Sequence, residues 1–115
     1  MKNLKSALLT PLLSVAECTL LGVPVHIRRL SALEISEYDE AIRSAREAGD
    51  MLEPARLSAS FILRSLVDDQ GKAIPQAQLP TTEELIAAQD NAALIKAVST
   101  IQKHSYGTLE EAQKN

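Results

Sequence analysis

Residues 55–67 (ARLSASFILRSLV) place apolar side chains over a broad arc when they are arranged at helical spacing. The arc contains Ala59, Ile62, Leu63, Leu66 and Val67, and it is widened by Leu57 and Phe61. A helix with so wide an apolar arc is buried by neighbours on several sides. Pro54 suits its first turn, where the missing amide hydrogen costs nothing. The pattern therefore predicts a central, buried helix.

The composition limits what can surround this helix. Apolar residues make up 45% of the 115-residue chain, but aromatic residues make up only 3% and Trp is absent. The core must then consist of Leu, Ile, Val and Ala, which favours packed helices over an aromatic-rich sandwich or barrel. A chain of this length forms one small domain.

A second helix is predicted between Ser31 and Gly49. Ser31 and Glu34 have the spacing of a capping box, and Gly49 provides the stop. Asp39 and Arg43 have the order and spacing of a helical ion pair. An apolar stripe at helical spacing contains Ile35, Tyr38, Ile42 and Ala45.

Two shorter patterns complete the predicted domain. Residues 15–21 and 23–29 read as two strands of a β-hairpin, which must lie against helices because an isolated hairpin is marginally stable. After a turn at 68–72 (DDQGK), Thr81 or Thr82 caps a short helix and Asp90 or Asn91 begins another, which ends at Gly107. The stripe of the last helix contains Leu94, Ile95, Val98 and Ile101.

We therefore expect a mainly α fold, a small helical domain of about four helices with an N-terminal β-hairpin packed on it. Residues 1–14 form an apolar arm, residues 15–107 the single domain and residues 108–115 a charged tail. The arm does not fit an export signal, because Thr10 and Pro11 interrupt its apolar run. Glu17 also precedes Cys18, where a lipoprotein signal has a small residue.

The chain shows no pattern typical of an active site or a metal site. Its zinc-type donors, Cys18, His26 and His104, include no closely spaced pair. The turn at 68–72 lacks the alternating acids and the later Glu of a calcium-binding EF-hand loop. No phosphate loop and no nucleophile motif is present. We predict that the protein is not an enzyme and uses no cofactor.

Nucleic acid and membranes are not expected as partners. The net charge is −3, and the last predicted helix has only Lys96 and Lys103 to contact phosphates. No apolar run approaches the roughly twenty residues of a membrane-spanning helix.

The order of the segments resembles a known family. IRRLSALEISEYDEAI is followed by a helix ending SLVDDQGK, then by LPTTEELIAAQDNAALIKAVSTIQKHSYG and the tail EEAQKN. Over residues 23–115, this arrangement is similar to the tail assembly chaperones of long-tailed, non-contractile bacteriophages and prophages. Alternatives that remain open are a structural tail component and a small bacterial helical adaptor or regulator.

The resemblance implies a cytoplasmic protein of the infected host that is absent from the mature virion. It implies binding to the tape measure protein, a long helical chain, and recruitment of tail tube subunits through a longer, frameshifted form. Gln113, Lys114 and Asn115 can be encoded as CAA-AAA-AAC, which contains the slippery run A-AAA-AAC. Self-association is also open.

Two apolar segments are candidate partner-binding sites. Leu8, Leu9, Leu12 and Leu13 lie in the arm, where they either dock on a partner or cover the chain's own helices. Val23 and Val25 lie on the predicted hairpin edge, which can pair with a partner strand.

Overall fold

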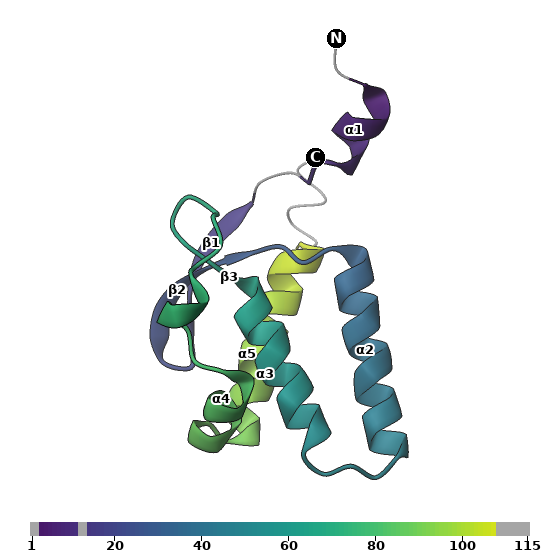
Figure 1. The fold of residues 1–115 in the computed structure, drawn as a ribbon, viewed down its shortest axis with the longest axis vertical. Coiled ribbons are helices and arrows are strands. Elements are labelled where there is room, and N and C mark those ends of the chain that lie inside the picture. Colours follow the sequence, from purple (N-terminus) through teal and green to yellow (C-terminus); the bar gives the residue numbers. More distant parts are fainter. Residues whose placement is uncertain (1–2, 12–13, 108–115) are drawn as a thin grey trace.

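The computed structural model describes residues 3–11 and 14–107, and it has the predicted architecture (Figure 1). The helices are α1 Leu4–Leu9, α2 Ala32–Glu47, α3 Glu53–Ser65, α4 Thr82–Ala88 and α5 Asn91–Tyr106, with a 3-10 turn at Gln76–Gln78. The strands are β1 Val15–Leu20, β2 Val23–Arg28 and β3 Leu66–Val67, and they form an antiparallel sheet in the order β1-β2-β3. The mainly helical fold with a packed N-terminal hairpin is confirmed.

Helix α3 is central, as its broad apolar arc predicts, because it packs against α2, α4 and α5. Ala59 and Ile62 are fully or almost fully buried on this helix. The ring of Phe61 packs at a tilt against the ring of Tyr38 on α2, with ring centroids 4.3 Å apart. The buried cluster joins this helix to the hairpin and to α2, α4 and α5 through Leu20, Ile27, Leu30, Ile35, Leu85, Leu94, Ala97, Val98 and Ile101.

The predicted helix starts are confirmed, and the structure decides between the alternatives. Ser31 and Glu34 form a complete capping box at α2, and Thr81 forms one with Glu84 at α4. The Asp90 carboxylate caps the start of α5 by accepting a hydrogen bond of 2.7 Å from the amide of Ala93. These local bonds satisfy amides that have no partner inside the helix.

The predicted end of α3 was wrong by two residues. The helix stops at Ser65, and Leu66 and Val67 form strand β3, which pairs with Ile27 and His26 of β2. The buried Ser65 hydroxyl donates to the carbonyl of Ile62, and the backbone then turns extended at Leu66. Apolar side chains at this end suit a helix or a strand, and the open edge of β2 decides in favour of the strand.

Two details of the helix surfaces also differ from the sequence prediction. Ile95 is 61% exposed, and Ala97 takes the buried place beside Leu94 in α5. On α2, Arg43 pairs with Glu40 and not with Asp39. Both acids lie within one turn of Arg43, and glutamate has the longer side chain. An exposed pair of this kind contributes little to stability.

The turn at 68–72 forms as predicted. The Asp68 carboxylate accepts hydrogen bonds from the amides of Gln70 and Lys72, at 2.8 and 2.9 Å. Within residues 3–11 and 14–107, no helix is both long enough and apolar enough to cross a membrane.

Candidate functional site

The N-terminal helix α1 carries exposed leucines. Leu8 and Leu9 are 76% and 72% exposed, and α1 has no buried residue. The Asn3 side chain caps the start of the helix by accepting from the amide of Lys5 at 2.8 Å. Figure 1 shows α1 pointing away from the packed helices. Leu12 and Leu13, the other predicted contacts of the arm, lie outside the described residues.

An apolar hollow of about 220 Å³, which we call the hairpin pocket, contains the two predicted hairpin residues. Val25 is half-buried in its wall, and Val23 is 54% exposed. The other lining residues come from the hairpin, α3, α4 and the segments beside them: Leu20, Leu21, Ile62, Leu63, Leu66, Pro80, Leu85 and Gln89. Gln89 alone among these residues has a polar side chain, so the pocket favours an uncharged apolar group.

The turn of the hairpin holds an unusual residue at the rim of this pocket. Leu21 and Gly22 have φ angles of +53° and +79°, as a two-residue hairpin turn of the primed type requires. Asparagine is common at such a position, and leucine there costs about 1–2 kcal/mol of backbone strain. The Leu21 side chain lines the hairpin pocket and packs against the buried cluster. Its contacts thus offset the strain.

The predicted open edge of the hairpin is partly covered. Strand β2 is the middle strand, because β3 pairs with His26 and Ile27 on its far side. Val23 and Val25 lie beyond this short pairing. They contribute their side chains to the hairpin pocket, so the structure brings them together with α3 and α4.

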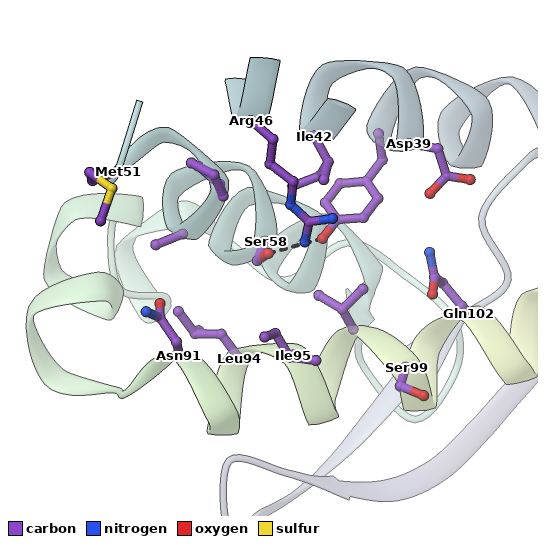
Figure 2. Close-up of a pocket in the computed structure, with 14 residues that line it drawn as sticks. Asp39, Ile42, Arg46, Met51, Ser58, Asn91, Leu94, Ile95, Ser99 and Gln102 are labelled. Carbon is purple, nitrogen blue, oxygen red and sulfur yellow. Dashed lines mark hydrogen bonds between the residues drawn. The ribbon is translucent and has the colours of Figure 1, made fainter. Parts of the chain in front are cut away.

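A second hollow, the interhelical groove, lies between α2, α3 and α5 and has a volume of about 450 Å³. Figure 2 shows Ile42 and Arg46 of α2 on one side and Leu94 and Ile95 of α5 on the other, with Ser58 of α3 between them. The remaining lining residues are Tyr38, Asp39, Met51, Pro54, Ala55, Asn91, Val98, Ser99 and Gln102.

The two hydroxyl groups at the floor of the interhelical groove form a hydrogen bond with one another. The Tyr38 hydroxyl and the Ser58 hydroxyl share a hydrogen bond of 2.9 Å. Burial raises the pKa of Tyr38, and the bond to Ser58 opposes this rise. The tyrosine therefore stays neutral at physiological pH and offers no charge to a partner.

The two walls of the groove carry apolar residues that the fold does not cover. Ile95 lies on the α5 wall, and Met51, which is 93% exposed, lies in the link between α2 and α3. Polar side chains border them, with Asp39 and Arg46 on α2 and Gln102 on α5. A groove with an apolar strip and polar margins is typical of sites that bind an amphipathic helix.

Sequence reasoning missed this groove because it assigned Ile95 to the core. The one signal was that Ile95 and Leu94 are adjacent, so both cannot face the centre of the same narrow stripe. The exposure of Met51 depends on how the link between α2 and α3 runs, which the apolar pattern does not specify.

The zinc-type donors are not assembled into a site. Cys18 is half-buried on β1, and burial raises the pKa of its thiol. His26 lies across from Glu17 in the hairpin, with 3.9 Å between the ring nitrogen and the carboxylate. His104 lies near the end of α5, with Nε2 3.4 Å from the carbonyl oxygen of Ser14. Among the described residues, no group of three His, Cys, Asp or Glu is placed to hold a metal.

Comparison with known proteins identifies one family. A family model described as "Phage tail assembly chaperone protein, TAC" matches residues 3–115, which is almost the whole chain. The match includes residues 3–22, which precede the segments that carried the resemblance in sequence. No curated protein and no solved structure matches the chain.

Proposed function

This chain belongs to the phage tail assembly chaperone family, and we propose that it binds the tape measure protein and keeps it soluble until the tail tube encloses it. The family match over residues 3–115 is the observation that carries this proposal. The role in tail assembly follows from family membership. The tape measure protein as the client is our inference from the sequence resemblance.

The physical problem that such a chaperone solves is exposed apolar surface. A long amphipathic helix leaves an apolar stripe in water until its partner arrives, and such stripes associate with one another. A small acidic protein with an apolar hollow can cover part of the stripe and add repulsive charge to the complex.

We assign the client contact to the hairpin pocket. It is bordered by side chains that are apolar and partly exposed, including Val23 at its rim. An apolar cavity of about 150 Å³ accepts a benzene-sized group, so a hollow of about 220 Å³ accepts a large aliphatic side chain. One inserted side chain for each chaperone gives a modest affinity, which suits a client that must later be released.

A pull-down with a matched control tests this assignment. The Val23→Glu variant should lose most of its co-purification with the tape measure protein, because a carboxylate at the rim resists transfer into an apolar pocket. Leu33→Glu is the control, since Leu33 is 68% exposed on α2 and lines neither hollow. Circular dichroism should show the same helical signal for both variants.

Light scattering measures the chaperone activity itself. The tape measure protein alone should aggregate as denaturant is diluted, and an equimolar amount of this chain should suppress the signal. Unchanged aggregation, together with no co-purification, would exclude the tape measure protein as the client. Equal loss of binding in the Val23→Glu and Leu33→Glu variants would exclude the hairpin pocket as the contact.

Recruitment of the tail tube protein is proposed to require a longer form of the chain. Ribosomes that slip back by one nucleotide at Gln113, Lys114 and Asn115 would add a C-terminal extension. Sequencing the gene tests this first, because CAG or AAG codons at these positions remove the slippery run. Mass spectrometry of the proteins expressed from this gene should then show a second, heavier product with the same N-terminus.

We also propose that the protein acts in the host cytoplasm and is absent from the finished virion. Quantitative mass spectrometry of purified particles should find the tail tube protein and no peptides of this chain. Peptides in stoichiometric amounts would instead indicate a structural component of the tail.

A further inference from the structure

We propose that copies of this chain associate head to tail, with α1 of one copy seated in the interhelical groove of the next. Both surfaces are present on every copy. Each carries exposed apolar side chains that no described residue covers: Leu8 and Leu9 on α1, and Ile95 and Met51 among the polar side chains of the groove. The proposal goes beyond client binding, which we assign to the hairpin pocket.

The sizes of the two surfaces match. Helix α1 has six residues and is therefore about 9 Å long at the helical rise of 1.5 Å per residue. The groove follows α5 from Asn91 to Gln102, a distance of about 16 Å at the same rise. Leu4 and Leu8 lie one turn apart on α1 and form a short apolar face that fits within the groove, while Leu9 lies about 100° round the helix from Leu8, at the margin of this face.

The arm and the rest of the chain carry net charges of opposite sign. The charged residues of the arm, Lys2 and Lys5, are both basic. The chain has 12 basic and 15 acidic residues in total, so the part outside the arm has 10 basic and 15 acidic residues and a net charge of −5. A basic arm and an acidic body attract one another between copies.

Asp39 and Arg46 set the direction in which α1 enters the groove. They lie seven residues apart on α2, which is about 10 Å along the helix axis, and both line the groove. Lys5 is favoured beside Asp39 and is repelled by Arg46. The leucines then lie over the apolar strip that contains Ile95.

The position of α1 favours the groove of a second copy over its own. The helix points away from the packed body (Figure 1), and no residue of α1 lines the groove of its own chain. A contact between two different surfaces is heterologous, so each bound copy still offers one free arm and one free groove. The expected product is therefore a series of oligomers, and the small area of α1 makes each contact weak.

Sedimentation of the full-length chain tests the proposal without any client. The weight-average mass of the wild type should rise with concentration over the micromolar to millimolar range. The Leu8→Glu, Leu9→Glu double variant and the Ile95→Glu variant should each remain monomeric at every concentration. Leu33→Glu removes an equally exposed leucine elsewhere and should associate like the wild type. Ile95→Ser repeats the groove test without adding charge, and circular dichroism checks that each variant is folded.

Mixing the two monomeric variants gives the sharpest result. The arm variant keeps an intact groove and the groove variant keeps an intact arm, so the mixture should form one complex of two chains and nothing larger. A wild type that stays monomeric at all concentrations, including one whose α1 folds into its own groove, overturns the proposal. So does association that survives either variant, and so does a mixture that remains monomeric.

Discussion

Arg28 and Glu34 form a two-point ion pair, with Nη1 of Arg28 3.1 Å from Oε1 and Nη2 2.8 Å from Oε2 of the glutamate. The same guanidinium donates from Nε to the carbonyl of Arg64 at the end of α3, and the same carboxylate accepts from the amide of Ser31. The pair therefore fixes the end of β2 to the start of α2 and the end of α3. It holds the hairpin on the helices.

This ion pair predicts a specific loss of stability in acid. Hydrogen bonds from Arg28 lower the pKa of Glu34 from 4.5 to about 2, against an opposing effect of burial. Because the folded-state pKa is the lower one, the contribution is complete above about pH 4.5 and is lost as the pH falls toward 2. We expect a loss of about 2 kcal/mol over this window, less than the full shift because water partly screens the pair.

The Glu34→Gln variant isolates this contribution. Other carboxylates titrate in the same window, so the quantity to measure is the difference between wild type and variant in the free energy of unfolding by urea. The difference should be largest above pH 4.5 and should shrink toward pH 2. A difference that does not change with pH would mean that Glu34 acts only as a helix cap.

Truncation of two isoleucines of α5 should change the stability by very different amounts. Ile101 is fully buried, so Ile101→Ala should lower the free energy of unfolding by about 2–5 kcal/mol. Ile95 is mostly exposed, so Ile95→Ala should change it by less than about 0.5 kcal/mol. Urea titrations measure both values, and a large cost at Ile95 would show that the groove is closed within the chain.

The hydrogen bond between Tyr38 and Ser58 should stabilise the floor of the interhelical groove by about 1 kcal/mol. Tyr38→Phe removes the hydroxyl and keeps the ring that packs against Phe61. Adding Ser58→Ala to this variant should cost less than Ser58→Ala costs in the wild type, because the two residues share one interaction. Additive losses in this double-mutant cycle would argue that the bond contributes no net stability.

The hairpin turn should be sensitive to backbone conformation and insensitive to side-chain volume. A Cβ at Gly22 would meet nothing within 4 Å, but the residue has a φ of +79°. Gly22→Ala should therefore cost about 1–2 kcal/mol from the left-handed backbone alone. Gly22→Asn should cost less, since asparagine tolerates this conformation. Equal costs for both variants would point to a steric cause instead.

The helix starts show what could be predicted from the sequence, because they depend on contacts between residues close in the chain. The Ser31 and Glu34 capping box, the Asp90 cap and the turn at Asp68 each use bonds that span four residues or fewer. The broad apolar arc of α3 also predicted that this helix is central. Such features are fixed locally, so spacing alone reveals them.

Strand β3 and the interhelical groove show where this reasoning fails. Leu66 and Val67 become a strand because β2, almost forty residues earlier, offers an unpaired edge. Ile95 was assigned to the core because periodicity does not fix how far a helix is rotated about its axis. Its neighbours on α2 and α3 make that choice, and they leave Ile95 beside Met51 at the groove.

The amino-acid sequence by itself determined the helical fold class, the ends of most elements and the family resemblance, since these follow from local bonding and from the order of segments along the chain. The tertiary structure decided which apolar residues stay uncovered. Exposure depends on which surfaces distant segments share, and only the packed chain shows that Val23, Val25 and Ile95 border hollows in the surface.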